Sequence, residues 1–208
     1  MEHKIIVVGI GPGSEEYILP IAKNFIINAK VLVGSKRALA IFTNDTCLRK
    51  IITGDIQSTL SFIRENLMYN DIVVMVSGDP GYYSLLSSLR ENFKVQQLHV
   101  IPGISSMQLA FARLAIPWQN ATLVSLHGRT PCKLDLKYNS EKVLGILTDT
   151  VYTSATISEL LLKNNWPSQT KVYICSQLSY ADEEIIETTI LDAIKAKVFT
   201  HCIMVVMA

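Results

Sequence analysis

Short apolar runs alternate with helical patterns from the start of the chain, an arrangement typical of βαβ units around a largely parallel sheet. Helices are predicted between the runs, one beginning with Pro20 at its first position, one from Tyr82 to Arg90 and one over 153–163. The pattern therefore predicts an α/β protein. The apolar runs predict strands over 4–9, 30–33, 71–76, 95–101, 121–126, 142–148, 171–176, 184–189 and 202–207.

Apolar side chains recur at helical spacing in three of the segments between strands, so we expect them to face the hydrophobic core. The first set follows Pro20, the second has spacings of four, three and four residues, and the third lies near residue 110. The sets are Ile21, Ala22, Phe25, Ile26 and Ala29; Ile56, Leu60, Ile63 and Leu67; and Leu109, Ala110 and Leu114.

The segment Ala-Ile-Pro-Trp-Gln-Asn at 115–120 breaks the helix that precedes it, because a proline disfavours the helical conformation of the residue before it. We expect a domain boundary here, with one α/β domain over 1–116 and a second over 117–208. The strands of the second half follow one another closely, so its sheet is predicted to be mixed, antiparallel in part.

Composition narrows the class of protein. Hydrophobic residues make up 49% of the 208 residues and charged residues 18%, which indicates a globular chain. The net charge of +1 argues against a nucleic-acid partner. The longest apolar runs are too short to cross a membrane, and the N-terminus lacks a signal-peptide cleavage site, so we expect a cytoplasmic protein. The four cysteines and four histidines are scattered, and no protein-built metal site is expected.

Three turns follow predicted strands directly, at Gly9–Ser14, Ser77–Gly81 and Ile101–Ser106. In a parallel sheet such turns gather at the carboxyl edge, where ligands bind, so we expect one site there. The first turn is not a dinucleotide loop, because Ser14 stands where the third glycine is required. It is not a nucleotide-triphosphate loop either, because no lysine follows its glycines.

Taken together, Gly-Ile-Gly-Pro-Gly at 9–13, Ser-Gly-Asp-Pro at 77–80 and Pro-Gly-Ile-Ser-Ser at 102–106 resemble the motifs of the tetrapyrrole (corrin and porphyrin) methyltransferase superfamily. The resemblance covers essentially the whole chain. It implies a two-domain fold, a parallel-sheet N-terminal domain plus a mixed-sheet C-terminal domain, with S-adenosylmethionine (SAM) held in the cleft between them. It also implies a homodimer.

Three further segments are similar to the branch of this superfamily that methylates the C5 meso carbon of (cobalt-)precorrin-7 in cobalamin biosynthesis. They are Val33–Leu39, Ser125–Arg129 and Gln177–Glu183. Sequences of that branch typically read Asn-Leu-Ser-Tyr-Pro-Asp-Glu where this chain has Gln177 and Ala181. The expected activity is SAM-dependent C-methyl transfer. Any cobalt would arrive inside the substrate.

The resemblance assigns cofactor and substrate residues by motif position, and it names no catalytic base. Asp79 would supply a carboxylate to the zwitterionic cofactor, and Leu178 a backbone contact. The macrocycle carries acetate and propionate groups, which call for cationic side chains, and four such residues are expected in loops near the cleft. The SAM-lining residues are Pro12, Ser77, Gly78, Asp79, Tyr82, Ser105, Ser106, Thr148 and Leu178, and the substrate-binding residues are Lys36, Arg37, His127 and Arg129.

Other functions stay open at this point. The chain could be another member of the superfamily, such as a diphthine synthase or a ribosomal-RNA methyltransferase, although the near-neutral charge argues against an RNA substrate. It could also be a SAM-binding subunit without turnover. Because the chain ends at Ala208, soon after its last predicted strand, we expect any C15-methylating and decarboxylating activity to lie in a separate partner enzyme.

Overall fold

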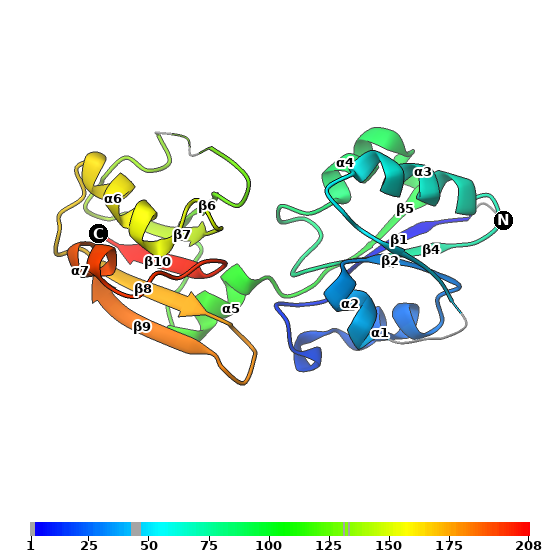
Figure 1. The fold of residues 1–208 in the computed structure, drawn as a ribbon, viewed down its shortest axis with the longest axis horizontal. Helices are drawn as coiled ribbons and strands as arrows, with labels where there is room; N and C mark the ends of the chain where they lie inside the picture. The colour runs from blue at the N-terminus through cyan, green and yellow to red at the C-terminus, as the bar shows by residue number, and fades with distance from the viewer. Residues whose placement is uncertain (1–2, 43–46, 131, 133) are drawn as a thin grey trace. The chain divides into compact units, whose positions relative to one another are not determined.

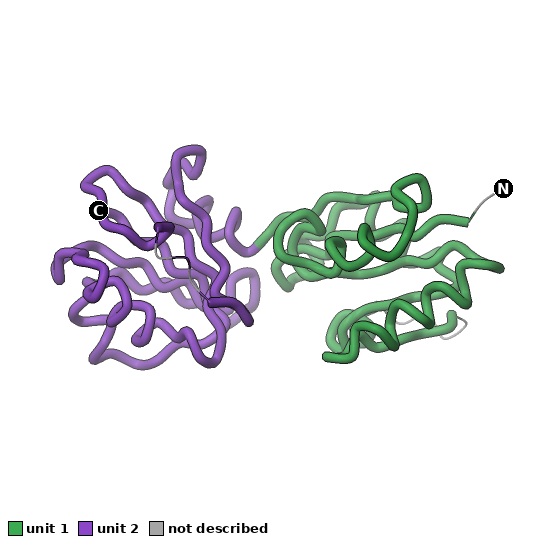
Figure 2. The backbone as a smooth tube through the Cα atoms, turned by 90° about the horizontal axis from the view of Figure 1, so that it is seen from above, with its two compact units in different colours: residues 1–105 green, residues 106–208 purple. Residues whose placement is uncertain are grey.

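The computed structural model describes residues 3–42, 47–130, 132 and 134–208. Its contacts divide the chain into two compact units, residues 1–105 and 106–208 (Figure 2). Each unit is built around its own five-stranded sheet. The expected α/β class with two sheets is therefore confirmed.

The sheet of unit 1 has the order β3-β2-β4-β1-β5, and every neighbouring pair is parallel. The central strands β1 and β4 are buried along their whole length, as expected for strands covered on both faces. The parallel sheet predicted for the first half is confirmed. The strands are β1 (Ile5–Gly9), β2 (Val31–Gly34), β3 (Leu48–Ile51), β4 (Ile72–Val76) and β5 (Leu98–Ile101).

Helices cover both faces of this sheet (Figure 1). Alternate residues of β1 divide between two apolar clusters, so that Ile6 and Val8 pack with α1 and α2, while Ile5 and Val7 pack with α3 and α4. The helices are α1 (Pro20–Ile27), α2 (Lys36–Ile41), α3 (Ile56–Asn66) and α4 (Leu86–Asn92), with short 3-10 helices at η1 (Glu15–Tyr17) and η2 (Val95–Gln97).

Pro20 opens α1 as predicted, and Leu60 and Ile63 of α3 are buried. The structure differs from the expectations for unit 1 at Ile21 and at the start of α4, and it adds one strand. Ile21 is 52% exposed, because only part of the predicted face of α1 meets the sheet. Strand β3 was not predicted, since it is an edge strand with little buried surface. The helix expected from Tyr82 begins only at Leu86, because turns occupy the intervening residues.

Unit 2 contains a mixed sheet of order β6-β7-β10-β8-β9, in which β6 and β7 are parallel and the other neighbouring pairs antiparallel. The mixed sheet predicted for the second half is confirmed. Its elements are α5 (Ser106–Arg113), β6 (Thr122–Ser125), β7 (Val143–Leu147), α6 (Ser154–Lys163), β8 (Lys171–Ser176), β9 (Glu184–Thr189), α7 (Ile190–Lys195) and β10 (Ile203–Met207).

The predicted helix over 153–163 is α6, which Thr153 caps at its start and which ends at Lys163, with Asn164 as its C-cap. Helix α7 was not predicted, because only two of its six residues, Ile190 and Ala193, are buried. No helix in the described part of the chain is long and apolar enough to span a membrane.

Helix α5 belongs to unit 2, because it packs on β7 and β10. Gly145 of β7 makes room for it: a Cβ atom there would lie 2.6 Å from Met107 Sδ and 2.9 Å from Phe111 Cε2. The contacts therefore divide the chain between Ser105 and Ser106. The sequence placed the boundary after residue 116, at the proline break, which follows this helix rather than preceding it.

Candidate functional site

The three glycine-rich turns lie together, because they follow the adjacent strands β4, β1 and β5 at the carboxyl edge of the unit 1 sheet. The backbone links the first two turns: Gly78 N–H donates to the Gly11 carbonyl at 2.8 Å, and Ile10 N–H donates to the Val76 carbonyl at 2.9 Å. The turns thus form one continuous surface of main chain, which we call the glycine edge (residues 9–13, 77–81 and 101–105).

Glycine is required in the glycine edge because the three loop backbones touch. A Cβ atom on Gly9 would lie 2.6 Å from the Gly78 carbonyl oxygen and 2.7 Å from Gly103 Cα. Real side chains do not tolerate such distances to main-chain atoms, which cannot swing aside. Close approach of main chain therefore shapes this part of unit 1.

The Asp79 carboxylate ties two of the loops together. Its Oδ1 accepts a hydrogen bond from Gly81 N–H at 2.7 Å, and its Oδ2 accepts one from Gly103 N–H at 3.0 Å. Both oxygens are thus engaged by backbone donors, one in its own turn and one in the loop after β5. The sequence predicts that this carboxylate binds the cofactor. The structure shows that it also links two loops of the glycine edge.

Tyr82 follows the second turn, and its hydroxyl group has an unsatisfied hydrogen-bonding capacity. The Oη atom is buried and has no hydrogen-bond partner among the described residues. Burial, with Tyr83 beside it, raises the pKa of Tyr82, so the phenol stays neutral and keeps its proton to donate. An orphaned buried donor next to the glycine edge is a feature that a bound ligand would satisfy.

The other residues assigned to the cofactor in unit 1 also lie on the glycine edge, with different exposures. Ser105 is buried, Pro12 is half-buried and Ser77 is exposed. The structure therefore brings together Pro12, Ser77, Gly78, Asp79, Tyr82 and Ser105 around three neighbouring strand ends.

Substituting Gly9 by alanine should lower the free energy of unfolding by about 1–3 kcal/mol, because the new methyl group must push two loop backbones apart. Denaturant unfolding monitored by circular dichroism measures the change. Gly54→Ala is the matched control, since a Cβ there meets no described atom within 4 Å. Equal stability of the Gly9→Ala variant and the wild type would contradict the close packing of the loops.

Asp79→Ala should weaken SAM binding by about 1–3 kcal/mol, because it leaves the N–H groups of Gly81 and Gly103 without their acceptor and loosens the edge. Asp79→Asn keeps one acceptor oxygen and should lose less. Isothermal calorimetry with SAM gives the affinities, and far-ultraviolet dichroism verifies folding. Unchanged SAM affinity in a folded Asp79→Ala variant would count against this site.

In unit 2, Thr148 follows β7 and is 2% exposed. Its hydroxyl accepts a hydrogen bond from Cys202 N–H at 2.8 Å and donates to the Cys202 carbonyl at 3.0 Å. The side chain of Thr148 is therefore engaged in joining β7 to the start of β10.

Asp149 organises the loop that carries two of the expected substrate residues. Its Oδ2 accepts from Gly128 N–H at 2.9 Å, and its Oδ1 accepts from the N–H groups of Val151 and Tyr152 at 2.7 and 2.6 Å. These bonds lower the pKa of Asp149, and the bond from Gly128 has the largest effect. Burial acts in the opposite direction. Gly128 lies between His127 and Arg129, so Asp149 fixes the backbone between them.

His127 and Arg129 are both exposed on this loop. The His127 ring lies edge-on to the ring of His201, with centroids 5.7 Å apart, and His201 has a positive φ of 53°. The histidine pair and Arg129 therefore offer nitrogen donors at one edge of unit 2. His201 was not predicted, because it lies far from His127 in sequence and outside every motif.

Asp149→Asn should remove part of the acid sensitivity of folding. A carboxyl whose pKa is lowered by folding contributes stability above its ordinary pKa of about 4, and this contribution disappears as the pH falls through the lowered value. The variant should be less stable at neutral pH, and the difference from wild type should shrink below about pH 4. Urea unfolding from pH 7 to pH 3 measures it; a pH-independent difference would contradict the assignment.

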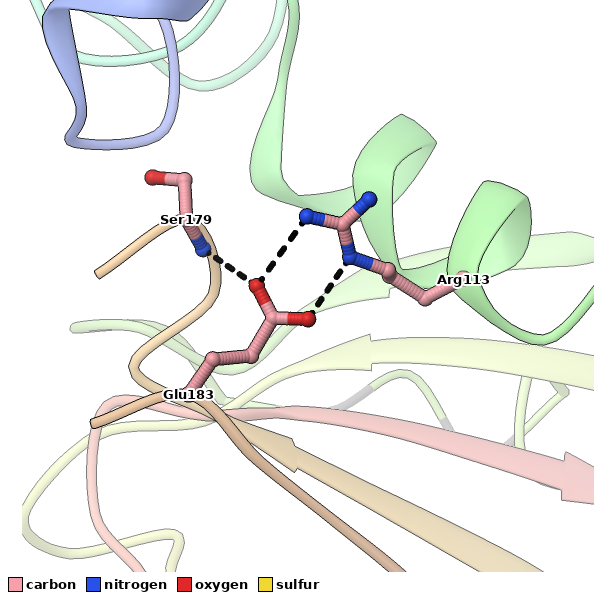
Figure 3. A network of polar contacts seen from close by, with 3 residues as sticks. All are labelled: Arg113, Ser179 and Glu183. Atoms are coloured by element: carbon pink, nitrogen blue, oxygen red, sulfur yellow. Dashed lines mark hydrogen bonds and ion pairs between the residues drawn. The ribbon is translucent and has the colours of Figure 1, made fainter. Parts of the chain in front are cut away.

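Leu178 lies in the loop between β8 and β9 and is 5% exposed. The residues on either side have positive φ values, 50° for Gln177 and 74° for Ser179. Glu183 accepts a hydrogen bond from Ser179 N–H at 2.7 Å and forms an ion pair with Arg113 of α5 (Figure 3). The Arg113 contact, aided by that of Ser179, lowers the pKa of Glu183.

Lys36 and Arg37 are not loop residues as expected. They form the first turn of α2, whose N-terminus Ser35 caps by accepting a hydrogen bond from Ala38 N–H at 3.1 Å. Both side chains are exposed. Ser106 likewise opens a helix, α5, and is half-buried.

No group of three or more His, Cys, Asp or Glu side chains in the described ranges could hold a metal ion.

Sequence reasoning missed Asp149, Glu183 and Arg113 as organising residues. Glu183 stands inside the motif Gln177–Glu183, so its position was noticed but not its role. The short Asp-x-x-Tyr stretch at 149–152 carries a turn signal, because an Asp side chain commonly accepts from N–H groups two or three residues further on. Nothing in the sequence pairs Arg113 with Glu183.

The fold and the glycine edge define a class: a two-sheet α/β protein with closely packed glycine loops at the carboxyl ends of a parallel sheet, the edge where α/β proteins bind ligands. Residues 4–194 match the family model of tetrapyrrole (corrin/porphyrin) methylases. The chain belongs to this family of methyltransferases.

Among curated proteins, the chain is 34% identical to a probable cobalt-precorrin-7 C(5)-methyltransferase of Methanocaldococcus jannaschii, over 87% of each chain. It is 28% identical to a decarboxylating precorrin-6Y C(5,15)-methyltransferase of a Sinorhizobium species, an alignment that covers 87% of this chain and 44% of that protein.

Solved structures share the fold. A precorrin-6Y methylase of cobalamin biosynthesis from Archaeoglobus fulgidus superposes with a TM-score of 0.75 at 25% identity, over 99% of this chain and 97% of that one. A uroporphyrin-III C-methyltransferase from Thermus thermophilus, complexed with S-adenosyl homocysteine, superposes with a TM-score of 0.77 at 17% identity, over 98% and 92%. The second likeness concerns the fold alone.

Proposed function

We propose that the chain transfers a methyl group from SAM to the C5 meso carbon of (cobalt-)precorrin-7, a step of corrin-ring biosynthesis. The observation that carries the proposal is the glycine edge, three touching loops at adjacent strand ends in a member of the tetrapyrrole methylase family. The name of the Methanocaldococcus jannaschii relative supports C5 as the position methylated.

The residues of the glycine edge fit SAM. The loops of this edge pack against one another because Gly9 and Gly103 carry no side chain, and main-chain groups at the strand ends would then contact the cofactor. The buried Tyr82 hydroxyl has a proton to donate and no partner among the residues described, and a polar group of the cofactor would satisfy it. In unit 2 the backbone beside Leu178 would provide a further contact.

SAM supplies a methyl group that its sulfonium makes electrophilic, so the protein needs to align the reactants rather than provide a nucleophile. The glycine edge would hold the donor. The macrocycle itself provides electron density at its meso carbon. The proposal therefore assigns binding and orientation to the protein, and no residue of the chain is proposed as the proton acceptor.

The exposed cations would bind the carboxylates of the macrocycle. Arg129 and His127 lie on the loop that Asp149 fixes, and Lys36 and Arg37 lie at the exposed start of α2. Arg129 suits a carboxylate best, because its planar group donates two parallel hydrogen bonds. These four residues are the proposed substrate-binding residues.

The same proposal includes a homodimer in the cytoplasm and a separate enzyme for C15 methylation and decarboxylation. The Sinorhizobium relative supports the partner, because its name gives both C5 and C15 positions and this chain aligns with less than half of it. A chain limited to the C5 step would then pass its product to another protein.

The test is an incubation of the purified protein with SAM and a panel of precorrin and cobalt-precorrin intermediates, followed by mass spectrometry. We expect one methyl group to be gained with precorrin-7 or its cobalt form, and fragmentation to place it at C5. Methylation of RNA or of a diphthamide precursor would overturn the proposal. SAM binding without turnover on any tetrapyrrole would identify a non-catalytic subunit instead.

Arg129→Ala should lower kcat/KM for the tetrapyrrole, because a carboxylate of the substrate loses its charged partner. The loss corresponds to about 2–4 kcal/mol of transition-state stabilisation. SAM affinity should stay the same, and Arg129→Lys should recover part of the loss. Steady-state kinetics and calorimetry separate the two effects. Equal losses of SAM and tetrapyrrole binding would place Arg129 in a structural role.

A further inference from the structure

The loop between β8 and β9 holds an unusual backbone conformation around Leu178. Gln177 and Ser179, the residues before and after it, both have positive φ values and neither is glycine. L-residues rarely adopt this conformation, so the surrounding structure must hold it in place. Leu178 itself is buried, which anchors its side chain and leaves its backbone orientation to the neighbouring residues.

Glu183 provides the restraint. One carboxylate oxygen, Oε2, accepts a hydrogen bond from the N–H of Ser179, one of the two residues with a positive φ, at 2.7 Å. The same oxygen accepts a second hydrogen bond from Arg113 Nη2 at 3.4 Å. The other oxygen, Oε1, accepts from Arg113 Nε at 2.6 Å. Figure 3 shows Glu183 between the loop and α5, with both partners pointing toward its carboxylate.

Arg113 gives this restraint a rigid base. It is the last residue of α5, a helix that packs on β7 and β10 through Met107 and Phe111. The side chain of Glu183 is 20% exposed and that of Arg113 is 38% exposed, so the pair is partly shielded from water. The chain of contacts therefore runs from the sheet through α5 to the backbone beside Leu178.

We infer that Glu183, held by Arg113, is a positioning residue that fixes the backbone of the Gln177–Ser179 segment for contact with SAM. The inference rests on the proposed function, because it takes Leu178 as a cofactor contact. It assigns Glu183 and Arg113 a part in cofactor affinity although neither would touch the reacting atoms. Loss of the restraint would free the strained segment to relax away from the orientation that binds the cofactor.

The test compares variants of the full chain by calorimetry with SAM, by thermal unfolding and by kinetics. Glu183→Ala should raise the Kd for SAM about ten-fold, because it removes the acceptor of Ser179 N–H and the partner of Arg113. Glu183→Gln keeps an acceptor for Ser179 and should raise the Kd about three-fold. Arg113→Lys should retain more affinity than Arg113→Met, and kcat at saturating SAM should be close to wild type in all four.

Glu187→Ala is the matched control. Glu187 lies on β9 of the same hairpin and pairs with Lys171 at 2.7 Å, away from the Leu178 loop. The Glu187→Ala variant should lower the melting temperature by about as much as the Glu183 variants do and leave the Kd for SAM unchanged. A merely structural Glu183 would behave like this control, with lowered stability and unchanged affinity, and that result would overturn the inference.

The two proposals fail in different ways. A wild-type chain that binds no SAM overturns the proposed function and the inference with it. A wild-type chain that binds SAM while Glu183→Gln and both Arg113 variants bind equally tightly overturns the inference alone. The three milder substitutions keep this comparison valid even where Glu183→Ala does not fold.

Discussion

Close contact between the main chains of Gly9, Gly78 and Gly103 is the constraint on which the carboxyl edge of the unit 1 sheet depends. The parallel order β4-β1-β5 brings three strand ends together, and only residues without a side chain let the loops that follow meet. Asp79 then joins two of these loops through backbone N–H groups. The result is a surface made mostly of main chain, whose shape is fixed by packing and which is proposed to bind the cofactor.

In unit 2, carboxylates fix two loops by accepting hydrogen bonds from their backbones. Asp149 accepts three backbone N–H groups around the His127–Arg129 loop, and Glu183 accepts one beside Leu178. The Glu183 bond helps to offset the cost of the backbone conformations of Gln177 and Ser179, about 1–2 kcal/mol for each non-glycine residue in the left-handed region. Both units therefore use a carboxylate that accepts backbone N–H groups to fix loops, and unit 1 adds the close packing of its glycines.

The sequence predicted the parallel sheet and its glycine turns because fully buried strands read as continuous apolar runs, and those of β1 and β4 are unbroken. It did not predict β3, whose Leu48 and Ile51 are exposed at a sheet edge, so the apolar signal is weak there. The start of α4 was misplaced because Tyr83 adopts a positive φ, which the sequence Tyr-Tyr-Ser-Leu does not indicate.

The candidate site was predictable to the extent that its parts are contiguous in sequence. Turns such as 77–81 carry their own glycine and aspartate signals, and their order along the chain pointed to one edge. The pairing of Asp79 with Gly103, or of Arg113 with Glu183, depends on the register of distant strands and helices, which no local pattern encodes. Under the proposed function those long-range contacts matter for affinity, because a displaced loop binds the methyl donor less tightly even when every motif residue is present.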